Sequence, residues 1–177
     1  MRILFVAAVI ATCLSVPAFA ADDSAAMRAT ANGFYGVYQT FHPSDGVPDG
    51  QGRARYQPFV SPALDALLTQ AGDAEERYAK ANKDSPPLIE GDLFSSLFEG
   101  ATGVIIGACS GDGHSGRCAA NLTHAEPGAK PTSWTDAVEL VNTQGGWRVN
   151  DVVYGGAWDF GNKGKLSDTL KQVIGFQ

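Results

Sequence analysis

The sequence predicts an α+β fold in which N-terminal helices pack on a curved antiparallel sheet of about four strands and a C-terminal helix closes the chain. Before residue 85, apolar side chains recur at helical spacing, whereas between 102 and 154 they mostly alternate with polar ones, as in strands. The strands form two hairpins in a row after the helices. This order is typical of an antiparallel sheet that helices cover on one face.

The chain begins with the features of a secretory signal peptide, residues 1–20. Arg2 supplies a positive start, an apolar run extends from Ile3 to Val16, and Ala18-Phe19-Ala20 forms a small-x-small cleavage site. We therefore expect cleavage before Ala21 and export to the periplasm.

The remaining residues, 21–177, are expected to form a single domain, large enough to bury a core. The chain carries 13 basic and 19 acidic side chains, a net charge of −6, and loss of Arg2 makes it one unit more negative. Because the surface is acidic and the basic residues are not clustered, we expect neither nucleic acid nor an anionic membrane as a partner. The apolar run from Ile3 to Val16 is too short for a comfortable membrane span, and we expect no membrane insertion after cleavage. Lipid attachment at Cys13 is an alternative, but only a short apolar run precedes that residue.

Two main helices are expected in the first half of the domain. The first covers Ala25 to Phe41, and its apolar stripe consists of Met27, Ala31, Phe34, Tyr38 and Phe41. A short irregular or helical piece follows from Arg53 to Val60. Ser61 is then the expected N-cap of a helix that runs from Pro62 to about Asn82.

Four strands are expected in two hairpins. The first pairs Thr102–Cys109 with Cys118–His124, and the mostly apolar Thr102–Cys109 is expected to be an inner strand. The second pairs Ser133–Val141 with Trp147–Tyr154 around a glycine-rich turn. These two pairs make up the predicted sheet.

Two further segments complete the predicted fold. Leu88–Gly100 is expected to be a loop with one helical turn between Phe94 and Phe98. The final helix covers Leu166–Ile174, where one apolar face consists of Leu166, Leu170, Val173 and Ile174.

Cys109 and Cys118 lie on the two arms of the first predicted hairpin. In an oxidising compartment, two cysteines placed in this way are expected to form a disulfide. The closed loop is short, so the chain-entropy model gives a stabilisation of about 2–3 kcal/mol. A reactive thiol pair would need Cys-x-x-Cys spacing and an electropositive setting, and the sequence has neither.

Short motifs follow one another along the domain in a characteristic order: Pro86-Pro87-Leu88, Gly91-Asp92-Leu93-Phe94, Phe98-Glu99-Gly100, Trp134-Thr135-Asp136, Gly146 to Gly155, and Leu166-Ser167-Asp168-Thr169-Leu170. Together, over residues 34–170, they resemble the secreted bacterial proteins grouped as domain of unknown function 3828. That family is similar in architecture to the nuclear transport factor 2-like cone, in which a helix lies across a bent antiparallel sheet. The resemblance implies a fold and a compartment, and it brings no catalytic residues.

An aromatic and acidic set of side chains is the candidate ligand site, because these residues are expected near the mouth of such a cone: Tyr35, Tyr38, Trp134, Asp136, Trp147, Asp151 and Tyr154. Aromatic walls with a few carboxylates suit a small-molecule pocket. A buried aspartate among apolar neighbours can also act as a general base. The alternative is that the aromatics form the core and that Asp136 and Asp151 cap or hold the hairpin.

No metal or cofactor is expected. His42, His114 and His124 lie at unrelated spacings in separate elements, unlike the ligands of a metal site. Gly111–Gly116 matches Gly-x-Gly-x-x-Gly, but a strand follows it, whereas a dinucleotide site needs a helix there.

We therefore expect a periplasmic, non-catalytic binding or accessory protein whose partner is an unknown small molecule held in the cone or another periplasmic protein. One alternative is a small acid/base enzyme that uses Asp136 or Asp151. Another is an immunity or inhibitor protein against a periplasmic toxin, which the acidic charge permits. A homodimer is left open.

Overall fold

The computed structural model describes residues 18–41 and 46–176. Its elements are, in chain order, α1 (Ala18–Thr40), α2 (Gly50–Tyr56), α3 (Pro62–Ala81), β1 (Gly103–Gly111), β2 (Ser115–His124), β3 (Thr132–Thr143), β4 (Gly146–Val153) and α4 (Leu166–Gly175). Most of the predicted signal peptide, residues 1–17, lies outside the described residues, as does His42. The end of that segment, 18–20, forms the start of α1.

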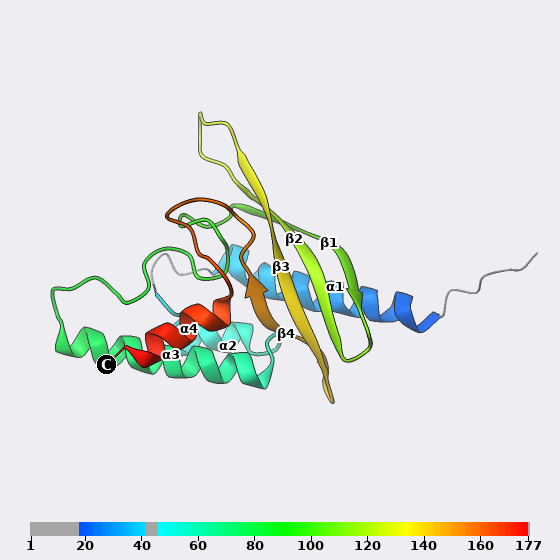
Figure 1. The fold of residues 1–177 in the computed structure, drawn as a ribbon, viewed down its shortest axis with the longest axis horizontal. Coiled ribbons are helices and arrows are strands. Elements are labelled where there is room, and N and C mark those ends of the chain that lie inside the picture. The colour runs from blue at the N-terminus through cyan, green and yellow to red at the C-terminus, as the bar shows by residue number, and fades with distance from the viewer. Residues whose placement is uncertain (1–17, 42–45, 177) are drawn as a thin grey trace, which may run out of the picture.

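The four strands form one antiparallel sheet in the order β1-β2-β3-β4, which confirms the predicted α+β fold. Helix α1 runs across one face of this sheet, and α3 and α4 lie side by side near β4 (Figure 1). Two hydrogen bonds tie α1 to the edge strands. Ser24 Oγ donates to the carbonyl oxygen of Cys109 in β1 (3.1 Å), and Thr30 Oγ1 donates to that of Trp147 in β4 (3.2 Å).

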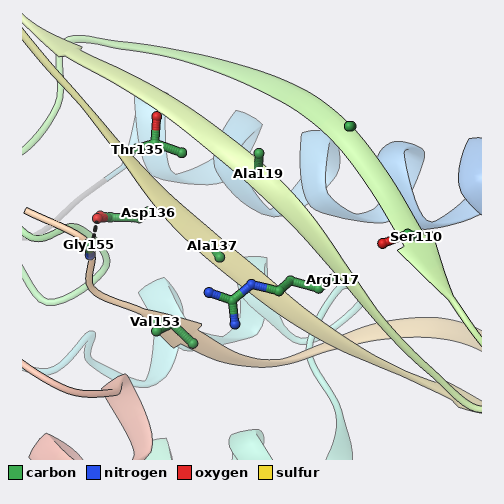
Figure 2. A pocket seen from close by; sticks show the side chains of 9 residues that line it. Ser110, Arg117, Ala119, Thr135, Asp136, Ala137, Val153 and Gly155 are labelled. Carbon is green, nitrogen blue, oxygen red and sulfur yellow. Dashed lines mark hydrogen bonds between the residues drawn. The ribbon is translucent and has the colours of Figure 1, made fainter.

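The face of the sheet away from α1 is open except at β4, where the first turn of α4 (Leu166–Gly175) covers Asp151. It carries Arg117, Ala119, Ala137 and Val153, which lie on the near side of the strands in Figure 2. Successive residues of a strand point to opposite sides, so the intervening side chains point toward α1 and are buried. The buried set includes Cys118, Ala120, Leu122, Val138 and Leu140.

The prediction that the first strand is an inner one is wrong. Among the described strands β1 pairs with β2 alone, at the edge of the sheet, and Ile105 is 72% exposed. The apolar run suggested burial on both faces, but only the face toward α1 is covered. An apolar run of this length cannot by itself distinguish an inner strand from an edge strand that packs against a helix.

Helix α3 begins as predicted. The Ser61 hydroxyl accepts a hydrogen bond from the backbone N–H of Leu64 (3.1 Å), and Pro62 is the first helical residue. The predicted helical turn between Phe94 and Phe98 is wrong, because this segment is an irregular loop. There the Asp92 carboxylate accepts a hydrogen bond from the N–H of Phe94 (2.8 Å), a local bond that competes with helix formation.

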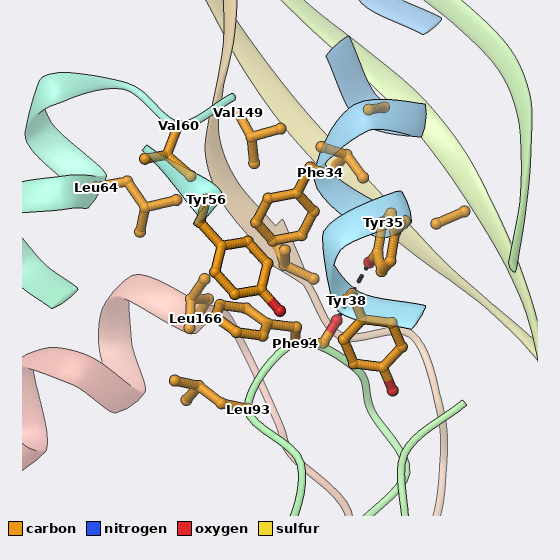
Figure 3. Close-up of a cluster of buried hydrophobic side chains, with 14 of the residues drawn as sticks. Phe34, Tyr35, Tyr38, Tyr56, Val60, Leu64, Leu93, Phe94, Val149 and Leu166 are labelled. Atoms are coloured by element: carbon orange, nitrogen blue, oxygen red, sulfur yellow. Dashed lines mark hydrogen bonds between the residues drawn. The ribbon is translucent and has the colours of Figure 1, made fainter. Parts of the chain in front are cut away.

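The core contains a cluster of aromatic rings between α1, α2 and the loop before β1 (Figure 3). The Phe34 ring lies 5.1 Å from Tyr35, 5.2 Å from Tyr56 and 5.3 Å from Phe94 between ring centroids, within the range of favourable aromatic pairs. The predicted stripe on α1 is buried as far as Tyr38. Its last member, Phe41, is instead exposed, and its ring stacks beneath the Arg55 guanidinium (4.7 Å).

The predicted disulfide is confirmed. Cys109 and Cys118 occupy directly paired positions of β1 and β2, with their Cα atoms 4.1 Å apart. The bond fixes the edge strand β1 to β2. A disulfide is typical of proteins that fold in an oxidising compartment.

The pKa values of four buried tyrosines generate a prediction about stability at high pH. Burial, with smaller contributions from nearby carboxylates, raises the pKa above the ordinary 10.0 for Tyr35, Tyr38, Tyr56 and Tyr154. The unfolded chain releases these protons near pH 10, whereas the folded protein retains them. The contribution of these tyrosines to the free energy of unfolding is therefore complete below pH 10. Above pH 10 the free energy of unfolding falls by about 1.4 kcal/mol per pH unit for each such tyrosine.

Urea unfolding at several pH values between 9 and 12 measures this slope. The variant Tyr56→Phe removes one ionisable hydroxyl while keeping the ring, so its slope should be shallower by about 1.4 kcal/mol per pH unit. A free energy of unfolding that stays level up to pH 11.5 would contradict the prediction.

Candidate functional site

All three predicted ligand-binding tyrosines lie behind the loop before β1 and bond to its backbone. Tyr35 Oη donates to the carbonyl oxygen of Phe94 (3.2 Å), and Tyr154 Oη donates to that of Leu93 (2.7 Å). Tyr38 Oη accepts a hydrogen bond from the backbone N–H of Ala101 (2.6 Å). All three side chains are buried. Their hydroxyls therefore position the loop from the inside.

Asp136 is 1% exposed and connects the same loop to the sheet. Its carboxylate accepts four hydrogen bonds, from Ser96 N (2.8 Å), Ser96 Oγ, Trp134 Nε1 (3.2 Å) and Gly155 N (2.8 Å). An ionised carboxylate has about four lone-pair positions, so these donors satisfy it. In this arrangement Asp136 is a structural anchor and has no position left to accept a proton from a substrate.

A second loop, residues 155–164 between β4 and α4, is bonded to the first. The backbone N–H of Gly156 donates to Ser96 Oγ (2.9 Å), and the N–H of Asn162 donates to the Ser96 carbonyl (2.9 Å). The Asn162 side-chain amide also donates to the carbonyls of Asp92 (2.6 Å) and Ser95 (2.7 Å). We call the joined segments 90–100 and 155–162 the two-loop platform.

A cleft of about 460 Å³ lies on the outer side of the two-loop platform and is lined by Glu90, Leu97, Phe98, Glu99, Trp158, Phe160 and Gly161. Small-molecule pockets commonly measure about 300–1,000 Å³. The side chain of Phe160 is 90% exposed and that of Phe98 is 42% exposed. Large apolar side chains thus gather at the surface on two loops that are otherwise fixed by hydrogen bonds.

Glycines allow the cleft's aromatic rings to lie close to the backbone. Gly91 has a φ of +75°, and a side chain there would collide with the Phe98 ring. A side chain at Gly156 would likewise collide with the Trp158 ring. Trp158 also makes an edge-to-face contact with Trp134, with 5.1 Å between ring centroids.

The other two predicted site residues lie elsewhere. Trp147 Nε1 donates to Asp23 Oδ1 (3.2 Å) at the beginning of α1. Asp151 accepts from Ser167 N (3.0 Å) and Ser167 Oγ (2.7 Å) in the first turn of α4, a helix whose N-cap residue makes no side-chain cap bond. Asp151 therefore supplies the missing cap from β4.

The structure thus brings five of the seven predicted residues together around the platform: Tyr35, Tyr38, Trp134, Asp136 and Tyr154. The prediction did not include the exposed Phe98 and Phe160 or the half-buried Trp158. The sequence does contain a signal for the last two, because they lie between glycines in a segment without helical or strand periodicity. Aromatic residues in such a loop are not expected to be buried in the core, because loops lie at the surface.

A second depression, of about 350 Å³, lies on the open face of the sheet (Figure 2). Its floor includes the small side chains of Ala119 and Ala137, and its one guanidinium, on Arg117, is paired with Glu139 (3.1 Å). Among the described residues that line it, none is aromatic. The platform cleft is therefore the better candidate for recognition.

Within residues 18–41 and 46–176, no three His, Cys, Asp or Glu side chains gather as metal ligands would. No helix in this part of the chain has both the length and the hydropathy of a membrane span. Comparisons with protein-family models, with curated proteins and with solved structures give no match for this chain.

The substitution Asp136→Asn tests the anchoring role of this carboxylate. An amide has one oxygen in place of two, and its NH₂ group would face backbone and side-chain donors. We expect the free energy of unfolding to fall by about 2–4 kcal/mol, measured by urea denaturation.

Asp84→Asn is the matched control, because Asp84 is exposed, and it should change stability by less than about 0.5 kcal/mol. If Asp136→Asn were as stable as the unsubstituted protein, the carboxylate would not be an anchor and the acid/base hypothesis would regain support.

Proposed function

We propose that the protein is a non-catalytic, periplasmic binding protein whose recognition site is the cleft of the two-loop platform. The observation that carries this proposal is the Phe160 ring, 90% exposed at the edge of the cleft. A bulky apolar side chain held in water loses the free energy that burial would provide. Exposed aromatic side chains that gather in a cleft are typical of surfaces that bind a ligand or partner.

The hydrogen bonds beneath the cleft support the same proposal. Ser96 and Asn162 join the two loops to each other, and Asp136 joins both to the sheet. Loops held in this way lose little conformational entropy when a ligand binds, so more of the contact energy appears as affinity. Rigid loops on a sheet scaffold are a common location for recognition residues.

The chemistry of the buried carboxylates supports binding over catalysis. Asp136 accepts four structural hydrogen bonds, and Asp151 caps α4. Among the histidines that the structure describes, His124 bonds to the carbonyl oxygen of Gly100 (2.8 Å) and His114 lies in the β1–β2 turn. None of these groups faces the aromatic cleft, so none is placed to act on a ligand bound there.

The proposal extends to the fold family and the compartment. A long helix across a four-stranded antiparallel sheet is compatible with the nuclear transport factor 2-like cone and with the resemblance to domain of unknown function 3828. The Cys109–Cys118 disulfide supports an oxidising compartment, as expected of a secreted protein. The proposed partners are a small molecule or a group on another periplasmic protein.

The three tryptophan indole N–H signals in a nitrogen-15 NMR spectrum test the site. Trp158 lines the cleft, Trp134 contacts Trp158, and Trp147 lies against α1, so Trp147 serves as an internal control. We expect at least one of benzyl alcohol, benzylamine, benzoate and glucose to shift the Trp158 signal with a dissociation constant of about 1–10 mM, without shifting that of Trp147.

The variant Phe160→Ala should weaken that shift at least threefold while leaving the remaining spectrum unchanged, because the side chain is exposed and contributes little to the fold. If no probe shifts the Trp158 signal, or if Phe160→Ala responds like the unsubstituted protein, the cleft is not the recognition site.

A further inference from the structure

The residues around the cleft combine aromatic rings with carboxylates. Glu90 and Glu99 line the cleft beside Phe98, Trp158 and Phe160. Both glutamates are exposed, and in the described part of the chain neither is paired with a Lys, Arg or His. This arrangement places negative charge next to apolar surface.

The described residues that line the cleft include no basic side chain. Lys163, in the loop between β4 and α4, is exposed and donates through its amine to the carbonyl oxygen of Trp158. It forms no ion pair with Glu90 or Glu99 among the described residues. The charge of the cleft is therefore left for a ligand to neutralise.

We propose that the cleft binds an organic cation, a substituted ammonium group that carries apolar substituents; this inference rests on the proposed binding function. The faces of Trp and Phe rings attract such a cation through their quadrupole, and Trp does so most strongly. The carboxylates of Glu90 and Glu99 add a Coulomb attraction from the rim. An anionic ligand is disfavoured by the same carboxylates, and a neutral apolar ligand gains only from the rings.

The two-loop platform gives this recognition its geometry. Phe98 is held over Gly91 on the first loop, and Trp158 is held over Gly156 on the second. The hydrogen bonds from Asn162 to the first loop hold the two loops together, so that both rings line one cleft. Because the walls are formed before the ligand arrives, the cleft selects by shape as well as by charge.

A pair of isosteres separates the charge from the shape of the ligand. Choline and 3,3-dimethylbutan-1-ol have nearly the same size, but only choline carries a positive charge. With the Trp158 indole signal as the readout, we expect choline to bind about tenfold more tightly than the alcohol at low ionic strength, with the preference shrinking as salt is added.

The double variant Glu90→Gln/Glu99→Gln should reduce the preference for choline at least threefold while leaving the affinity for 3,3-dimethylbutan-1-ol unchanged. Its matched control is Asp73→Asn/Asp84→Asn, which removes two exposed charges from α3 and the loop after it. This control should retain the preference. If both double variants lose it equally, the net charge of the protein is responsible and the proposed cation site is wrong.

The capped peptide acetyl-Gly-Lys-Gly-amide distinguishes the two sources of such a cation. Binding of choline alone indicates a free small molecule, and equal binding of the peptide indicates a side chain presented by another protein; either result supports the cation site. Equal affinity for choline and the alcohol overturns the inference and leaves the binding function standing. If neither isostere nor any probe of the NMR panel binds, both proposals fail.

Discussion

The hydrogen bonds to the carboxylate of Asp136 are the interaction on which the rest of the structure depends. A buried charge is tolerated only when its lone pairs are met by donors, because desolvation is otherwise too costly. The donors come from three segments: Trp134 on β3, Ser96 in the loop before β1, and Gly155 at the start of the loop after β4. One side chain thereby fixes two loops that are far apart in the sequence.

The organisation of the platform explains why its surface differs from its interior. Beneath the loops, the hydroxyls of Tyr35, Tyr38 and Tyr154 meet backbone groups, so polar atoms there are satisfied within the protein. Above them, Phe98 and Phe160 remain exposed beside carboxylates that have no basic partner among the described residues. The side of the two loops that faces the core therefore consists of hydrogen-bonded polar groups. The side that faces the solvent consists of exposed aromatic rings and carboxylates.

The fold could largely be predicted from the sequence because its signals are local. The spacing of Met27, Ala31 and Phe34 specified a buried helix face, and Ser61-Pro62 marked the start of α3. The position of β1 at the sheet edge could not be predicted, since strand order depends on contacts between distant segments. Residues 94–98 were mistaken for a helical turn because the bonds that shape this loop come from Asp92, Asp136 and Asn162, which lie mostly elsewhere in the chain.

The candidate site could be predicted only in part. The aromatic and acidic character of the set around Asp136 was visible in the sequence, but the direction of each side chain depends on register. A bulge beside Asn150 shifts the register of β4, and Asp151 then lies opposite Glu139 and beneath α4. Phe160 was overlooked because exposure of a loop residue depends on how the loop is anchored, and Asn162 provides that anchor through tertiary bonds.

Amide hydrogen exchange at Ser96 and Gly155 is the most direct test of the central claim that Asp136 joins the two loops. Both N–H groups donate to this carboxylate, and both lie in segments without helix or strand hydrogen bonds. We expect protection that approaches the free energy of global unfolding, as in core strands, and loss of that protection in both amides together when the carboxylate is removed. Rapid exchange at either amide in the unsubstituted protein, at rates typical of mobile loops, would contradict it.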